Sequence, residues 1–258
     1  MKPTLPLALL AWLAAPLMAC AQPAALTTQR PEVIATYPHD TSAFTQGLFM
    51  HDGQLFESTG QVGESSLRRV DLTTGSVLQQ VNINPPIFGE GSARIGDEIY
   101  MVSWVSEAGF IFNAETFELI DQFSYPGEGW GLTTDGTSLI LSDGSPQLRV
   151  LDPATMELVR TLDVTLNGRP VRRINELEWI DGEIWANIWE TRTIIRINPE
   201  SGVVTGLIDL TALIPDGLEG DRSAVANGIA WNSETGQIFL TGKLWPVLYE
   251  IRLPDAAE

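Results

Sequence analysis

The chain has 258 residues, of which 44% are hydrophobic, so it can bury a substantial core and is not a disordered protein. Its formal net charge of −18 at pH 7 argues against nucleic-acid binding, because neutralising phosphates requires patches of lysine and arginine. An acidic surface favours cationic partners, such as a peptide with a free N-terminal amine, although any acidic exported protein would carry a similar charge.

The N-terminus has the features of an export signal. Lys2 supplies a positive end, and residues 5–17 form an apolar stretch that is too short to cross a membrane. Residues 17–20 (LMAC) resemble a lipobox that would make Cys20 the lipidated first residue, whereas cleavage at an A-x-A site would leave Gln22 first. Cys20 is the only cysteine and cannot form an internal disulfide, which favours the lipobox. We therefore predict an exported protein, either periplasmic or anchored to the outer membrane through Cys20.

A turn followed by an apolar strand recurs five times in the rest of the chain, without any long helical periodicity. The copies begin at residues 54, 98, 138, 183 and 237, which are 44, 40, 45 and 54 residues apart. Another strand precedes each copy, and a hairpin follows each of the first four. Four strands in about 40–45 residues is the length of a propeller blade. The longest interval contains an insertion at 210–225, which we expect to carry a short helix and to lie over one face.

The two ends of this repeat array complement each other. The fifth repeat stops after residues 248–253 and lacks a fourth strand, while a spare strand lies at residues 32–37. Pairing these segments would close the ring and cover an exposed sheet edge. The sequence thus predicts an all-β, five-bladed propeller over residues 32–254, closed by the N-terminal strand, after a signal peptide at 1–21 and a polar linker at 22–31.

Distinctive side chains lie in the loops that lead into the innermost strands. These loops should gather at one mouth of the central channel, because the innermost strand of each blade lines it. Each loop carries a different polar or aromatic residue, which indicates a site, although turn residues and channel plugs would be an alternative explanation. The segments are 44–47, 88–91, 129–131, 175–178 and 227–228.

Glu90 and Lys243 are the most informative of the polar candidates. Glu90 lies between two glycines, which would permit unusual backbone geometry and the close approach of a ligand. At an apolar, tryptophan-lined mouth its charged form should be disfavoured, which suits proton transfer, whereas a solvated loop glutamate would have no such role. Lys243 is the only lysine that export would leave, and lysine is a compact point donor.

Metal and serine chemistry have little support in the sequence. The chain has two histidines and contains no His-x-His, His-Glu-x-x-His or cysteine cluster, and no Gly-x-Ser-x-Gly segment. A calcium ion bound by carboxylates and carbonyls could still be a structural component of the channel. Carboxylate chemistry is therefore the leading hypothesis, without a cofactor required for catalysis.

The motifs of the chain resemble those of the plant and bacterial glutaminyl cyclases over residues 32–252. They lie at 37–48, 55–60, 88–91, 129–132, 142–144, 175–178, 185–189, 227–231 and 241–246. The resemblance implies a five-bladed propeller, unrelated to the zinc-dependent animal enzymes. It also implies conversion of the N-terminal glutaminyl residue of a peptide or protein to pyroglutamyl, with release of ammonia.

The resemblance also implies a set of site residues. Carried over by position, the catalytic residues would be Glu90, Lys243, Asn175 and Gln46, and the substrate-binding residues would be Phe44, Phe88, Trp104, Trp130 and Trp189. Glu90 would shuttle a proton, while the lysine and the two amides would donate to the developing charge or orient the amide. Two other classes remain open, namely a calcium-dependent, lactonase-like propeller hydrolase and a non-catalytic binding propeller.

Overall fold

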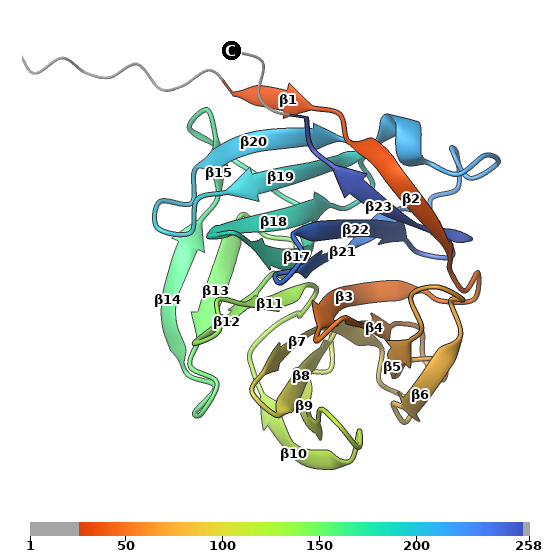
Figure 1. Ribbon diagram of the computed structural model, residues 1–258. Coiled ribbons are helices and arrows are strands. Elements are labelled where there is room, and N and C mark those ends of the chain that lie inside the picture. Colours follow the sequence, from red (N-terminus) through yellow and green to blue (C-terminus); the bar gives the residue numbers. More distant parts are fainter. Residues whose placement is uncertain (1–25, 255–258) are drawn as a thin grey trace, which may run out of the picture.

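The computed structural model describes residues 26–254, which fold into five mainly antiparallel sheets that follow one another along the chain (Figure 1). Blade 1 holds β3 (Thr45–His51), β4 (Gln54–Thr59), β5 (Ser66–Val70) and β6 (Val77–Asn82). Blade 2 holds β7 (Gly89–Ile95), β8 (Glu98–Ser103), β9 (Ala108–Asn113) and β10 (Leu119–Ser124). Blade 3 holds β11 (Leu132–Thr134), β12 (Leu139–Leu141), β13 (Gln147–Leu151) and β14 (Leu158–Asp163).

The last two blades recruit strands from the N-terminal segment. Blade 4 holds β17 (Ile174–Ile180), β18 (Glu183–Ile188), β19 (Thr193–Ile197), β20 (Val204–Asp209) and β1 (Thr27–Gln29). Blade 5 holds β21 (Ala226–Asn232), β22 (Gln237–Gly242), β23 (Val247–Arg252) and β2 (Glu32–Pro38). A small hairpin, β15 (Thr165–Leu166) and β16 (Arg169–Pro170), lies between blades 3 and 4, and the 3-10 helix η1 (Thr211–Leu213) follows blade 4.

Short turn signals in the sequence account for the repeated hairpins. Asp52-Gly53 joins β3 to β4 and Asp181-Gly182 joins β17 to β18, and all four residues have positive φ. Two consecutive residues of this kind form the tight turn that matches the twist of paired strands. The longer turns after β5, β9 and β19 begin with Asp or Asn, whose side-chain oxygen accepts the backbone N–H three residues on.

The ring closes as predicted. β2 pairs antiparallel with β23, from Glu32 opposite Arg252 to Pro38 opposite Val247, and supplies the fourth strand that blade 5 lacks. The adjoining His39 is buried, and its ring nitrogens lie 2.7 Å from the Trp245 carbonyl oxygen and 3.0 Å from Glu57 Oε1. The closing segment is therefore attached to blades 5 and 1 together.

The segment predicted as a polar linker differs from that expectation. β1 lies within it and pairs in parallel with the outer edge of β20, with Thr28 opposite Leu207. A three-residue strand has no apolar alternation that a sequence pattern could reveal, and it forms here because the edge of blade 4 offers unpaired backbone groups. The predicted signal peptide and Cys20 lie outside the described residues.

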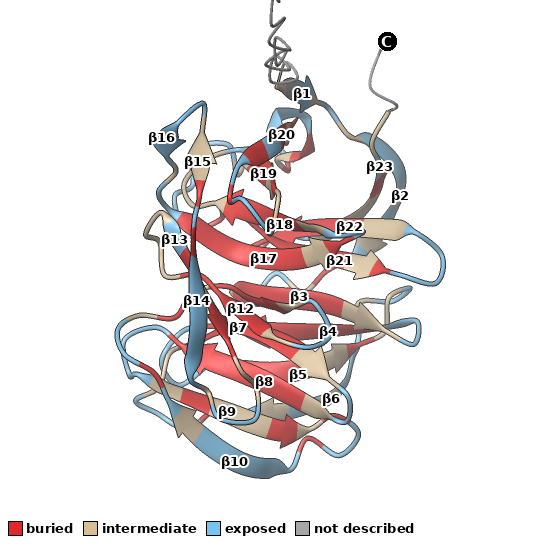
Figure 2. Cartoon of the chain, turned by 90° about the vertical axis from the view of Figure 1, so that its left-hand side faces the viewer, coloured by how far each residue is buried: buried red, intermediate tan, exposed pale blue. Residues whose placement is uncertain are grey.

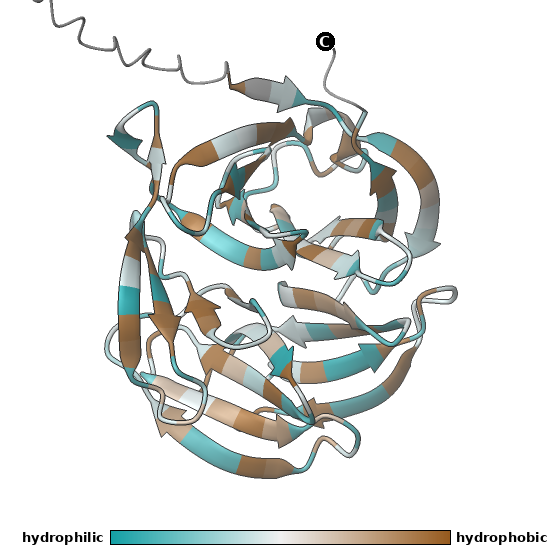
Figure 3. Cartoon of the chain, turned by 60° about the vertical axis from the view of Figure 1, so that its left-hand side comes forward, coloured by the Kyte–Doolittle hydropathy of each residue, from teal (hydrophilic) through white to brown (hydrophobic). Residues whose placement is uncertain are grey.

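The core lies between the blades. The described residues form five buried apolar clusters, each shared by two adjacent sheets. The inner strands β3, β7 and β17 are largely buried, whereas the outer strands β6, β10 and β14 are mostly exposed (Figure 2). Polar and apolar segments alternate within single strands, as expected for sheets that pack against neighbours (Figure 3). No helix among the described residues is long and apolar enough to cross a membrane.

Candidate active site

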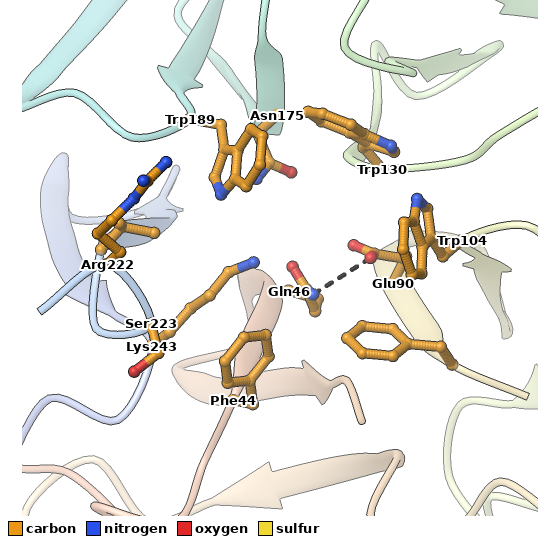
Figure 4. Close-up of a pocket in the computed structure, with 12 residues that line it drawn as sticks. Phe44, Gln46, Glu90, Trp104, Trp130, Asn175, Trp189, Arg222, Ser223 and Lys243 are labelled. Carbon is orange, nitrogen blue, oxygen red and sulfur yellow. Dashed lines mark hydrogen bonds between the residues drawn. The ribbon is translucent and has the colours of Figure 1, made fainter. Parts of the chain in front are cut away.

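A pocket with a volume of about 210 Å³ contains every site residue predicted from the sequence. Its lining consists of Phe44, Gln46, Phe88, Glu90, Trp104, Trp130, Asn175, Trp189, Arg222, Ser223, Val225 and Lys243. All five blades contribute. The polar side chains of Gln46, Glu90 and Lys243 point into a common space with aromatic rings around it (Figure 4).

The hairpin geometry explains why residues so distant in sequence meet here. In an antiparallel hairpin, the start of the inner strand and the end of the second strand lie at the same end of the blade. Gln46 and Glu90 belong to the first position, since they lie at the start of β3 and β7. Trp104 and Lys243 belong to the second, since they directly follow β8 and β22. The blade repeat therefore delivers all of them to one mouth of the channel.

Glu90 is a buried carboxyl with little compensation for its charge. The residue is 6% exposed, and burial raises the pKa of its carboxyl well above its ordinary value, with Lys243 acting in the opposite direction and Glu128 reinforcing the rise. Among the described residues, Gln46 alone donates a hydrogen bond to this carboxyl, from Nε2 to Oε1 over 3.2 Å. The Glu90 carboxyl thus holds its proton to a higher pH than an ordinary glutamate does.

The glycines beside Glu90 do not have the unusual backbone geometry that was predicted for them, whereas the close approach of a ligand stays a prediction. Neither Gly89 nor Gly91 has a positive φ, so the backbone is not unusual there. A Cβ on Gly91 would lie 2.4 Å from the Leu132 nitrogen, and one on Gly89 would lie 2.4 Å from Cε of Met101. Gly91 is required because the backbone of blade 3 approaches it closely, which places Glu90 at a tight junction between blades 2 and 3, whereas the nearest atom to Gly89 is the flexible end of the Met101 side chain.

Lys243 is a buried amine on the opposite side of the pocket. It is 5% exposed, and burial lowers its pKa to about 8, against an opposing effect of Glu90. Its Nζ lies 4.7 Å from the centre of the Phe44 ring, a distance at which the ring face attracts a cation. The backbone N–H of Lys243 donates to the Val225 carbonyl at 2.9 Å. The amine is therefore held in place and can donate a proton or a hydrogen bond.

Two amide side chains have defined orientations. Asn227 is fully buried, and its Nδ2 donates to the Thr45 carbonyl at 2.9 Å and to Gln46 Oε1 at 3.3 Å. Since the Gln46 oxygen accepts from Asn227, the Gln46 amide N–H group faces Glu90.

Asn175 Oδ1 is buried and has no hydrogen-bond partner within residues 26–254. A buried acceptor without a partner is costly, so this oxygen suits an N–H group of a bound ligand.

The aromatic residues form two walls. Phe44 contacts Phe88 edge-on at 6.1 Å, and Phe88 contacts Trp104 at 5.7 Å, between ring centres. On the other side, Trp130 and Trp189 contact edge-on at 5.5 Å. Such rings accept flat groups and exclude water from a small pocket.

Several residues around the pocket were not predicted as site residues. Arg222, Ser223 and Val225 come from the insertion at 210–225, which carries a short 3-10 helix as expected and also contributes to the pocket, which was not predicted. Glu128 lies just outside the lining and accepts hydrogen bonds from the indoles of Trp104 and Trp130. The sequence around Glu128 gave one usable signal, its position two residues before Trp130 in a Gly-Glu-Gly-Trp segment.

The residues described by the structure contain no group of three or more histidine, cysteine, aspartate or glutamate side chains arranged to hold a metal ion. Metal-independent catalysis and the structural calcium both stay predictions.

The fold and the pocket define a class, the propellers that carry a polar site at one mouth of the channel. Within this class, the sequence profile of the family described as glutamine cyclotransferase matches residues 5–253, so the chain belongs to that family. The chain is 44% identical to the glutaminyl-peptide cyclotransferase of Arabidopsis thaliana over 230 residues, which cover 88% of this chain and 72% of the plant protein. The crystal structure of Myxococcus xanthus glutaminyl cyclase matches with a TM-score of 0.84 and 38% identity, over 90% of this chain and 100% of the other. The predicted family and fold class are confirmed.

Proposed function

We propose that this pocket cyclises the N-terminal glutaminyl residue of peptides or proteins to pyroglutamyl with release of ammonia, with Glu90 as the proton shuttle and without a metal. This reaction is the one that the name of its family, glutamine cyclotransferase, describes. One observation carries the proposal, namely a buried carboxyl of raised pKa and a buried amine of lowered pKa in one aromatic pocket.

The reaction needs no nucleophile from the protein, because the α-amine of the substrate attacks its own side-chain carboxamide carbon. A carbon–nitrogen bond forms, the tetrahedral intermediate collapses, and the bond to the carboxamide nitrogen breaks. Holding the two groups together supplies an effective molarity of about 10⁵–10⁸ M in favourable cases. The aromatic walls hold this conformation and exclude water, whose attack would give deamidation instead of cyclisation.

Glu90 balances the protons of this exchange. Its carboxylate takes a proton from the attacking amine and then gives it to the leaving nitrogen, which departs as ammonia. A peptide α-amine has a pKa of about 7.7–8.0, so a carboxyl of raised pKa is better matched to it than an ordinary glutamate. The single donor from Gln46 leaves the other carboxyl oxygen free for the substrate.

The remaining polar groups match the charge that develops. The carboxamide oxygen becomes negative as the ring closes, and Lys243 and the Gln46 amide are donors directed into the same space. With a pKa of about 8, Lys243 keeps its proton at neutral pH in most molecules. Asn175 Oδ1 is a free acceptor that suits an N–H group of the substrate and would orient it.

The test is ammonia release from a Gln-initiated dipeptide in the presence of a chelator, for the wild type, Glu90→Gln and the control Glu64→Gln. We expect chelator-resistant release, a fall of about 10²–10⁴-fold in kcat for Glu90→Gln, and no change for the control, whose side chain is exposed. Near-normal turnover by Glu90→Gln would refute the shuttle. Release that a chelator abolishes would favour a calcium-dependent enzyme, and binding without release would favour the non-catalytic propeller.

The proposal includes export and a lipid anchor on Cys20. It is supported by the apolar segment at 5–17 and by the position of the only cysteine. Fractionation of cells that express the wild type and Cys20→Ser should show membrane attachment lost in the variant. Mass spectrometry of the mature N-terminus distinguishes the alternative, in which Gln22 comes first and loses ammonia by cyclisation. A wild type that remains entirely soluble would contradict the anchor.

A further inference from the structure

The carboxylate of Glu128 joins two tryptophans that belong to different blades. Its Oε2 atom accepts hydrogen bonds from Nε1 of Trp104 and from Nε1 of Trp130, each at 2.8 Å. Trp104 follows β8 of blade 2, and Trp130 precedes β11 of blade 3. A single oxygen therefore bridges the two aromatic walls of the pocket.

The backbone around Glu128 is fixed by contacts of its own. The Arg149 guanidinium donates to the carbonyl oxygens of Pro126 and Glu128, and Gly127 N–H donates to Glu107 Oε1 at 2.8 Å. Gly129 N–H donates to the Trp104 carbonyl at 3.0 Å. These hydrogen bonds fix the backbone of the loop, so the Glu128 carboxylate can hold the two indole rings at a fixed position.

Trp104 needs such a tether more than a core residue would. The residue is 41% exposed at the rim of the pocket, so packing restrains it on one side only. Phe88 contacts the Trp104 ring there, while Trp130 packs on Trp189 across the mouth. Hydrogen bonds to an ionised acceptor are stronger than neutral ones, which suits a carboxylate for holding an exposed indole.

We propose that Glu128 is a positioning residue of the cyclisation site, which fixes the separation of the Trp104 and Trp130 indoles and so sets the opening that receives the N-terminal glutamine. This inference rests on the proposed function. Loss of the tether should weaken substrate binding more than turnover, because the hydrogen bond between Gln46 and Glu90 does not involve Glu128. The effect of the Glu128 charge on the pKa of Glu90 is lost equally in Glu128→Ala and Glu128→Gln, so a difference between these variants reports on the hydrogen bonds to the indoles.

A set of variants separates the hydrogen bonds from the charge. Glu128→Gln keeps an amide oxygen with two lone pairs, which can accept both indole N–H groups, whereas Glu128→Ala removes the acceptor. We expect Glu128→Ala to raise KM by about tenfold with kcat changed less than about threefold, and Glu128→Gln to lie close to the wild type. Glu98→Ala is the control, since it removes a carboxylate that accepts from Tyr100 on the same blade, away from the pocket.

Two further measurements test the tether itself. In a double-mutant cycle, the effect of Glu128→Ala on KM should shrink when Trp104 is already phenylalanine, because the donor is gone. In nitrogen-15 spectra, Glu128→Ala should move the indole N–H resonances of Trp104 and Trp130, each assigned through its phenylalanine variant, and leave those of the other described tryptophans in place. The spectra report on the tether even for a protein without cyclase activity, so failure of the proposed function is recognised separately.

An unchanged KM for Glu128→Ala would overturn the proposal, as would unmoved indole resonances. Equal impairment of Glu128→Ala and Glu128→Gln would also overturn it, because the charge and not the acceptor would then be responsible.

Discussion

Glu57 and Glu90 are two buried glutamates on adjacent blades, and their surroundings are opposite. Glu57 is 2% exposed and Glu90 is 6% exposed, and Ser58, next to Glu57, donates to the Glu90 carbonyl at 2.7 Å. Burial alone would raise the pKa of Glu57, but the combined effect of His39, Thr45 and Arg68 lowers it. Burial dominates at Glu90, where the pKa is raised well above its ordinary value.

The difference separates a structural carboxylate from a reactive one. Glu57 Oε1 lies 3.0 Å from His39 Nε2 and accepts from Thr45 Oγ1 at 2.7 Å, so its charge is compensated. Both ring nitrogens of His39 face acceptors, a geometry that requires the protonated imidazolium. Glu90 has one amide donor and a pocket beside it. Burial disfavours the charge of both carboxyls, and the partners of Glu57 outweigh this effect, whereas those of Glu90 do not.

The largest expected effect on stability comes from Glu57→Gln. It leaves the buried His39 without its carboxylate partner, while Arg68 keeps its ion pair with Asp40, and should lower the free energy of unfolding by about 3–5 kcal/mol. Glu90→Gln should change it by less than about 1 kcal/mol, because an amide replaces a carboxyl that is disfavoured as an ion. Urea unfolding of both variants at one pH measures the contrast, and equal losses would contradict it.

The pH dependence of stability should have opposite signs at the two glutamates. The pKa of Glu57 is lowered from 4.5 by folding, so its contribution is present above pH 4.5 and is lost as the pH falls through the folded pKa. The pKa of Glu90 is raised from 4.5, so its contribution is present below pH 4.5 and is lost as the pH rises through the folded pKa.

His39, the partner of Glu57, makes the stability of the protein depend on pH on the alkaline side as well. Burial lowers the pKa of His39, but Glu57, the Trp245 carbonyl and Asp40 together raise it by more, so the net shift is upward from 6.5. Its contribution is complete below pH 6.5 and is lost as the pH rises through the folded pKa. Melting temperature against pH for wild type, Glu57→Gln and Glu90→Gln checks these signs. Parallel curves for the two variants would show that the carboxyls are equivalent.

A smaller effect is expected from Asn227→Ala, which acts on the Glu90 site through Gln46. Without the Asn227 donor, the Gln46 amide can turn its oxygen toward Glu90, which would disfavour the carboxylate. We expect kcat/KM to fall by about tenfold, the effect of losing one buried hydrogen bond. Steady-state kinetics measure it, with Asn232→Ala, in a turn of the same blade, as the control. An unchanged kcat/KM would show that Gln46 orients itself.

The smallest effect should follow from Arg222→Ala at the rim. This exposed side chain pairs with Glu190, and solvent screens an exposed ion pair strongly. The midpoint of urea unfolding should therefore stay close to that of the wild type, and KM for a Gln-initiated dipeptide should rise by less than about threefold. A larger rise in KM would assign Arg222 a direct contact with the peptide beyond its first residue.

The five blades and the positions of the predicted site residues could be read from the sequence because their determinants are local. Tight turns such as Asp52-Gly53 and Asp181-Gly182 fix the hairpins, and the spacing of the repeats fixes the blade length. Antiparallel pairing then brings the starts of inner strands and the ends of second strands to one mouth. The particular set of site residues was implied by the resemblance to a known family, which selected them from the candidates at that mouth.

Only the tertiary structure shows which of these residues are held in position by residues of other blades. The hydrogen bond between Asn227 and Gln46 joins residues 181 positions apart, and the ring must close before it can form. Glu128 accepts from two indoles of different blades, and Gly91 beside Glu90 is required by the close approach of the blade 3 backbone. Repeats specify one blade at a time, whereas burial, partner choice and pKa arise where blades meet, and no local pattern carries that information.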